Sequence, residues 1–277
     1  MNTAPASPLE LSNPRPRRWP RWLGLGLLLG LLALAVLGPG LAGHDPRVQD
    51  LQQVRAAPSA QHWLGTDHLG RDQLARLAAA LRLSLGLALA TVASAAAVGT
   101  ALGLWAAWRG GWVDRLTVAL ANGVVALPGL LLVLLVAAAW PGSFTALYAG
   151  LAVALWVEYF RVVRALAVGL LASPQVEASR LLGFGWAYVL RRHLAPPLWP
   201  LLATLACFGS ANAVLAMAAL GFVGVGLQPP TAELGVMLVE LLPTYQEAPW
   251  LLAAPACALC ALLLGLVLLA GDRGTAP

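Results

Sequence analysis

Two thiols near the end of the chain have the spacing of a redox or zinc motif. Cys257 and Cys260 are separated by two residues, and such a pair can form a redox dithiol or half of a zinc site. A zinc site would also need a second pair or a nearby histidine, whereas the neighbours here are Ala, Leu and Pro. We therefore interpret both thiols, with Cys207 in another apolar run, as small packing residues of helices that form no disulfide framework.

One carboxylate and one guanidinium lie inside an otherwise apolar stretch. Glu158 and Arg161 are three residues apart, so on a helix they share a face and can pair. Carriers driven by protons or sodium usually place carboxylates at membrane depth, so a structural ion pair and a coupling carboxylate are both open interpretations. A phosphate-binding loop needs Lys, and the chain has none. The sequence therefore predicts no ATP site, and the energy for any transport comes from elsewhere.

The composition restricts the class of protein to one that crosses a membrane several times. Hydrophobic residues make up 60% of the 277 positions and charged residues only 10%, whereas soluble domains carry about 25% charged residues. A water-soluble enzyme and a disordered chain are both excluded. The net charge of +5 comes from Arg residues that lie between apolar runs. This pattern indicates membrane topology rather than nucleic-acid binding.

Six apolar runs are long enough to cross a bilayer, which takes about 20 residues of helix. The first follows a basic segment and could be a signal peptide, but it exceeds the usual h-region of about 7–15 residues. We interpret it as a retained first span, and we expect Pro128 to kink the third. The predicted spans are Trp22 to about Ala42, and about 76–108, 116–140, 146–170, 197–227 and 250–270.

The distribution of Arg predicts the orientation of these spans. The N-terminal segment, the loop 109–115, the segment 161–192 and the tail hold 4, 2, 5 and 1 Arg, against five on the opposite side. Because cytoplasmic loops carry the excess of Arg, we predict that both termini are cytoplasmic. The loops 43–75 and 228–249 are then external.

The cytoplasmic segment 172–196 contains a motif with a known counterpart. Glu177, Ala178 and Ser179 are followed by Gly183, and the segment closes at Pro196. This pattern resembles the EAA loop of binding-protein-dependent ABC importer permeases. From the pattern alone, an ordinary amphipathic helix at the membrane surface is the alternative. We expect Glu177 to His193 to form a short surface helix, with Glu177, Arg180, Arg191 and Arg192 facing water or a partner and Leu181, Leu182, Val189 and Leu190 facing apolar neighbours.

Further stretches resemble one branch of that family, the dipeptide, oligopeptide and nickel permeases. They are residues 62–72, 110–114 and 219–238, so the resemblance covers roughly residues 60–272, and it is strongest to the C-type dipeptide permease. Asn122, Leu234 and Pro197 depart from the family pattern. The cargo therefore stays open among dipeptides, longer peptides, nickel chelates, opines and glutathione.

The resemblance implies an all-α polytopic membrane protein with six transmembrane helices, the transmembrane domain of a type I ABC importer. Residues 1–60 would be the cytoplasmic N-terminus, the first span and the start of the external loop, and residues 61–277 the importer core. The protein would lie in the bacterial cytoplasmic membrane and would need no cofactor of its own. It would form a heterodimer with a second permease subunit and work with two ATP-binding subunits and an external solute-binding protein.

The resemblance also assigns candidate roles to three sets of residues. The ATPase-coupling set is Glu177, Ala178, Ser179, Gly183 and Pro196. The external set, a structural cap or a docking site, is Gly65, Asp67, Gly70, Arg71 and Asp72, of which Asp67, Arg71 and Asp72 can form a salt-bridged turn. The set for helix packing or for lining the pathway is Gly221, Phe222, Gly224 and Gly226. A stand-alone secondary carrier or channel and an intramembrane enzyme are the alternative functions.

Overall fold

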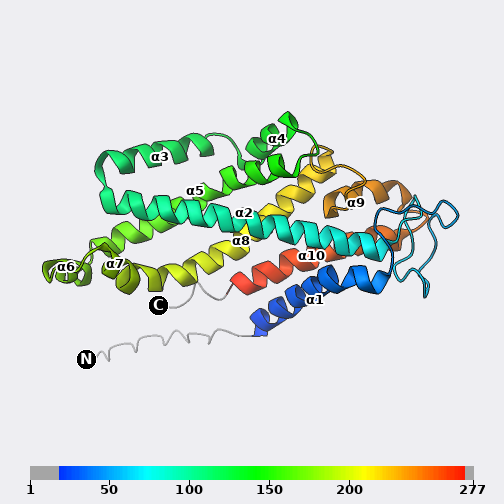
Figure 1. Ribbon diagram of the computed structural model, residues 1–277, viewed down its shortest axis with the longest axis horizontal. Coiled ribbons are helices and arrows are strands. Elements are labelled where there is room, and N and C mark those ends of the chain that lie inside the picture. The colour runs from blue at the N-terminus through cyan, green and yellow to red at the C-terminus, as the bar shows by residue number, and fades with distance from the viewer. Residues whose placement is uncertain (1–18, 272–277) are drawn as a thin grey trace, which may run out of the picture.

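The computed structural model describes residues 19–271, and every regular element in that range is a helix. The long helices run along the longest axis of the molecule (Figure 1). Helix α2 (Gln73–Arg109) lies in the middle, α1 (Trp19–Ala42) and α10 (Pro249–Ala270) pack along one half of it, and α5 (Phe144–Leu171) crosses behind it along the other half. The N-terminal Arg15, Arg17 and Arg18 and the tail beyond Gly271 lie outside the described residues.

Small residues let these helices approach closely. A Cβ on Gly24 of α1 would lie 2.8 Å from the carbonyl oxygen of Gly265 on α10. A Cβ on Gly99 or Gly103 of α2 would press against the main chain of α5. Glycine lines helix interfaces in membranes because it allows such main-chain approach. The contacts therefore fix α1 to α10 and α2 to α5.

The predicted third span is broken in two. Helix α3 (Gly111–Val125) and helix α4 (Gly129–Ala139) are separated at Pro128 and bent by 76° relative to each other. Proline lacks the N–H that would continue the helical hydrogen bonds, and it restricts the preceding residue to extended conformations. The expected kink at Pro128 is thus confirmed, as a break rather than a gentle bend.

Helix α8 (Ala195–Val223) follows the segment 172–196, which the sequence predicts to be cytoplasmic. It is preceded by α6 (Pro174–Leu181), α7 (Trp186–Val189) and one π-helical turn (Leu190–Leu194). Gly224, with a φ of +81°, ends α8 in the left-handed conformation that favours glycine. A short helix, α9 (Leu234–Leu241), and a 3₁₀ turn (Leu242–Thr244) then lead to α10.

The structure supports fewer membrane spans than the six predicted from the sequence. Among the described residues, four helical stretches are long and apolar enough to cross a membrane, or five if the bent pair α3 and α4 counts as one. Helix α5 has 28 residues but carries Glu158, Arg161 and Arg164, which lower its mean hydropathy. The count of six therefore stays a prediction.

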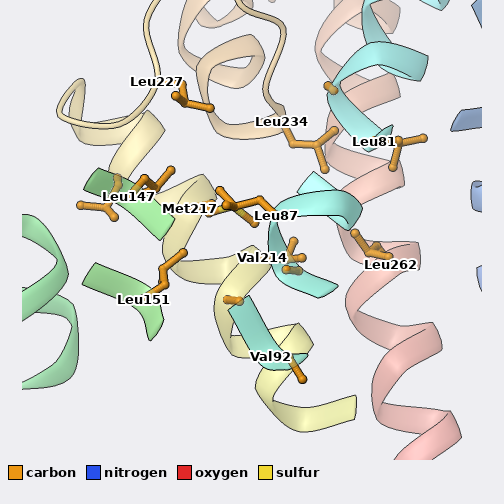
Figure 2. Packing of buried hydrophobic residues seen from close by; sticks show 14 of the residues in the cluster. Leu81, Leu87, Val92, Leu147, Leu151, Val214, Met217, Leu227, Leu234 and Leu262 are labelled. Carbon is orange, nitrogen blue, oxygen red and sulfur yellow. The ribbon is translucent and has the colours of Figure 1, made fainter. Parts of the chain in front are cut away.

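One apolar core joins the long helices. Leu81, Leu87 and Val92 of α2 meet Val214 and Met217 of α8 (Figure 2). Leu147 and Leu151 of α5 and Leu262 of α10 close the cluster. This core holds the two ends of the molecule at a fixed separation: α6 and α7 at one end, and the 43–72 segment with α9 at the other (Figure 1).

Candidate functional site

The predicted coupling segment forms a small helical hairpin that projects from one end of the molecule (Figure 1). Helix α6 begins at Pro174, where a missing N–H costs nothing. The Ser179 hydroxyl donates to the Gln175 carbonyl at 2.9 Å and lies 2.9 Å from Nε2 of His193. Ser179 therefore ties α6 to the π-helical turn before α8. This links a residue of the candidate set to the long helix that follows.

Gly183 makes the turn between α6 and α7. Its φ of +83° lies in the left-handed region, and a Cβ there would meet open space. The following amide, of Phe184, donates to the Ser179 carbonyl at 3.1 Å, which closes the turn. Gly185 is also in open space but has a φ of −80°. Only Gly183 needs a conformation that other residues avoid.

The surface of this hairpin differs in part from the sequence prediction. The four charged residues Glu177, Arg180, Arg191 and Arg192 are exposed, as expected, and Val189 is buried. Leu181 and Leu182, expected to face apolar neighbours, are instead 83% and 76% exposed. That expectation was wrong because the turn at Gly183 carries both side chains to the tip of the hairpin. The candidate residues Ala178 and Pro196 are also exposed.

At the opposite end, two arginines and two carboxylates form a buried ionic cluster, Asp67–Arg71–Arg76–Glu240. Arg71 Nε donates to Asp67 Oδ2 at 2.6 Å, and Arg71 Nη2 lies 3.2 Å from Glu240 Oε1. Arg76 binds the same two carboxylates. Both arginine side chains are 1% exposed. The cluster joins the 61–72 segment and the start of α2 to α9.

The environment of Asp67 favours its charged form. Burial alone would raise the pKa of Asp67, but the charge of Arg76 and hydrogen bonds from the Arg71 and Leu69 amides and the Arg71 side chain outweigh it. The pKa of Asp67 therefore lies below its ordinary value. The carboxylate stays ionised at neutral pH, as an ionic cluster requires.

Two glycines of the external set let the 61–72 segment pack closely against the main chain of the preceding loop. Gly65 has a φ of +75° and Gly70 a φ of +73°. A Cβ on Gly65 would collide with the Ala56 carbonyl, and one on Gly70 with the Asp50 carbonyl. Both positions require glycine for conformation and for space.

Asp72, the last member of the external set, has a different role from the one expected. The salt-bridged turn forms between Asp67 and Arg71, but Asp72 lies outside it. Its Oδ1 caps α2 by accepting from the Ala75 amide at 2.7 Å, and its Oδ2 lies 2.8 Å from His62 Nδ1. An aspartate before the first helical residue satisfies an amide that has no partner within the helix.

The glycines at the end of α8 pack against α9 and its cap. Glu233 caps α9 by accepting from the Val236 amide at 3.0 Å, and a Cβ on Gly221 would lie 2.5 Å from Glu233 Oε2. Gly226 lies against the main chain of Gly221. Phe222 is 55% exposed. The contacts favour packing for Gly221 and Gly226, whereas Phe222 is available to a further surface.

Charged residues of α5 pair with α3 rather than with each other. Arg161 Nη2 donates to Asn122 Oδ1 at 3.0 Å, and Arg164 Nη2 donates to Asp114 Oδ2 at 2.6 Å. The predicted ion pair between Glu158 and Arg161 does not form in the described chain. Arg161 extends toward α3 because Asn122, one of the departures from the family pattern, offers an acceptor there. Cys257 and Cys260 are exposed free thiols on α10.

Sequence reasoning missed Glu240 and Arg76 as partners of the 61–72 segment. They are 164 residues apart, and nothing in the local pattern connects them. The signal available was a pair of charges at the edges of apolar runs. Charged residues inside membrane spans are rare and usually pair with one another.

Comparisons with known proteins agree with this architecture. Residues 99–273 match the family described as "Binding-protein-dependent transport system inner membrane component". The nickel transport system permease protein NikC of Escherichia coli K12 is 36% identical over 221 residues, 80% of each chain. The dipeptide transport system permease protein DppC of Haemophilus influenzae is 31% identical over 256 residues, 90% of this chain and 86% of that one. The di/tripeptide permease DppC of Pseudomonas aeruginosa is 34% identical over 271 residues, 92% of this chain and 89% of that one.

These matches define the class of protein. The chain belongs to the family of binding-protein-dependent transport system inner membrane components. Within it, the chain is a membrane permease of the peptide and nickel importer group of ABC transporters, not an enzyme.

Proposed function

We propose that this chain forms half of the translocation pathway of an ATP-driven importer for dipeptides or oligopeptides. An external solute-binding protein delivers the peptide, a second permease subunit completes the pathway as a heterodimer, and two ATP-binding subunits supply the energy. The three relatives named above are permeases for nickel or for peptides of two or three residues. The peptide assignment extends that similarity to this chain.

The proposed topology has six spans with both termini in the cytoplasm. Helices α1, α2, α5, α8 and α10 each cross once, and the bent pair α3 and α4 crosses together. Residues 1–60 precede the importer core of residues 61–277. The hairpin of α6 and α7 then lies on the cytoplasmic side, and the ionic cluster on the external side of the bacterial cytoplasmic membrane.

The observation that carries the proposal is the pair of exposed leucines at the tip of the hairpin. Leu181 and Leu182 are exposed in this chain, and two adjacent apolar side chains on a projecting tip fit an apolar groove on a soluble partner. That partner is the ATP-binding subunit. Glu177, Ala178, Ser179, Gly183 and Pro196 set the shape of the contact, because Ser179 and Gly183 fix the hairpin on α8.

The external and pathway sets receive structural roles in this proposal. The segment with Gly65, Asp67, Gly70, Arg71 and Asp72 closes the external end and presents a rigid surface to the delivering protein. Gly221, Gly224 and Gly226 let α8 end beside α9. Phe222 faces the second permease.

Co-purification tests the coupling contact. The tagged chain carrying Leu181→Asp and Leu182→Asp is isolated in mild detergent beside the wild type. The matched control is Leu51→Asp, which alters a leucine that is 72% exposed in the loop at the opposite end. We expect the double variant to lose the ATP-binding subunits but keep the second permease, while the control keeps both. Retention of the ATP-binding subunits by the double variant would contradict the proposed contact.

A further inference from the structure

Three side chains able to bind a metal ion meet where α1 ends and α2 begins. His44 follows the last residue of α1 by two positions, His62 lies in the 43–72 segment, and Asp72 caps α2. One donor atom from each residue lies within 4.8 Å of the other two. His44 and His62 have no role in the coupling hairpin or the ionic cluster. Their convergence from separate parts of the chain therefore calls for its own explanation.

His62 and Asp72 already have the separation of two neighbouring metal ligands. His62 Nδ1 lies 2.8 Å from Asp72 Oδ2, and two adjacent ligands of a metal at about 2.1 Å lie about 3 Å apart. The second oxygen of Asp72 stays bound to the Ala75 amide at 2.7 Å, which fixes the carboxylate in place. On binding, the metal takes the place of the hydrogen bond between the two groups, and the one proton of the neutral imidazole moves to Nε2.

His44 supplies the third donor and can move to do so. Its ring centroid lies 4.7 Å from that of His62, its side chain is exposed, and Gly43 before it has a φ of +64°. Tetrahedral ligands of zinc lie about 3.4 Å apart, and the donor atoms here lie within 4.8 Å of one another, so closure needs a shift of up to about 1.4 Å. His44 Nδ1 lies 2.5 Å from the Ala42 carbonyl oxygen, and because the side chain is exposed the ring can turn about this contact without unpacking the core.

The surroundings favour a cation with open coordination positions. The three donors line a hollow of about 740 Å³ that Asp45 and Asp50 also border. The added carboxylates attract positive charge, and the open space admits water as the remaining ligands. Two imidazoles and one carboxylate suit Zn²⁺ or Ni²⁺, whereas Mg²⁺ and Ca²⁺ prefer oxygen ligands alone.

We propose that His44, His62 and Asp72 form a binding site for a divalent transition metal of the Zn²⁺ or Ni²⁺ class. The bound ion links the end of α1 to the 61–72 segment and the start of α2. The site stands on its own geometry, so it does not depend on the cargo or the coupling contact proposed above.

Metal binding by the full chain tests the site. The chain, carrying a tag without histidine, is placed in lipid nanodiscs, freed of metal with a chelator, and dialysed against Zn²⁺ or Ni²⁺. His44→Ala and His62→Ala remove one ligand each. His68→Ala is the matched control, because His68 lies in the same segment outside the cluster. His44→Ala is the decisive variant, since His44 is exposed and its loss leaves the His62–Asp72 contact in place.

We expect one ion per chain in the wild type and in His68→Ala, and a dissociation constant about tenfold or more higher in His44→Ala and His62→Ala. Zn²⁺ should also slow amide hydrogen exchange in residues 41–48 of the wild type and of His68→Ala, but not of His44→Ala. Absence of binding by the wild type at metal concentrations well above that of the chain would overturn the proposal. Equal binding by wild type and His44→Ala would also overturn it.

Discussion

Replacing Asp67 by Asn tests whether the buried ionic cluster holds the 61–72 segment and the start of α2 to α9. Asp67 Oδ1 accepts from the amides of Leu69 and Arg71 at 2.8 and 2.9 Å, and Oδ2 accepts from the side chains of Arg71 and Arg76. Asn keeps only one of the two oxygens and turns an amide donor toward other donors. It also leaves two buried guanidinium groups with Glu240 as their one carboxylate partner in the cluster.

The size of the effect follows from the burial of the cluster. Removing one member of a buried ion pair costs about 3–5 kcal/mol. In a chain of this length, 1 kcal/mol moves the unfolding midpoint by about 2–4 °C. We therefore expect Asp67→Asn to lower the midpoint by roughly 6–20 °C.

The exposed pair of Arg55 and Glu247 provides a control of the same chemistry. Its side chains are 41% and 63% exposed, and such pairs contribute about 0–1 kcal/mol. Both Asp67→Asn and Glu247→Gln remove one carboxylate charge, and thermal unfolding of the purified chain in detergent compares them. If the unfolding midpoint of Asp67→Asn equals that of Glu247→Gln, the cluster does not stabilise the junction of the 61–72 segment and α2 with α9, and the reasoning is refuted.

Three further predictions concern pH and glycine. The pKa of Asp67 is lowered in the folded chain, so its contribution to stability is present above its unfolded pKa of about 4. That contribution is lost as pH falls from there through the lower folded pKa, and the unfolding midpoints of wild type and Asp67→Asn should converge below the folded pKa. Gly183→Ala should weaken co-purification of the ATP-binding subunits because of its φ of +83°, while Gly185→Ala, with a φ of −80°, should not. Gly99→Ala should lower the unfolding midpoint because its Cβ meets the main chain of α5, whereas Gly86→Ala, facing open space on the same helix, should leave it unchanged or higher.

The sequence predicts the features of this protein that depend on local pattern. Apolar runs indicate where long helices occur, and Pro128 marks the break in the predicted third span because proline acts within one turn. Gly183 and the glycines of the 61–72 segment likewise indicate turns, because glycine also acts on the local backbone. Family motifs then predict the class of protein and point to the hairpin of α6 and α7, whose coupling role is proposed above.

Features that depend on contacts between residues far apart in the chain could not be predicted from the sequence. Whether Arg161 contacts Glu158 or Asn122 depends on how α3 lies against α5, and a helical spacing of three permits the first contact without requiring it. The exposure of Leu181 and Leu182 depends on the direction of the turn at Gly183. The meeting of Glu240 with Arg76 depends on the path of the chain through several helices.

Transport in proteoliposomes tests the central claim most directly. The complex isolated with the tagged chain is reconstituted, with the solute-binding protein and a labelled dipeptide on one side and ATP on the other. The account predicts peptide accumulation that needs both ATP and the binding protein and that is lost in the variant with Leu181→Asp and Leu182→Asp. Accumulation driven by an ion gradient without ATP, and unchanged in that variant, would contradict it.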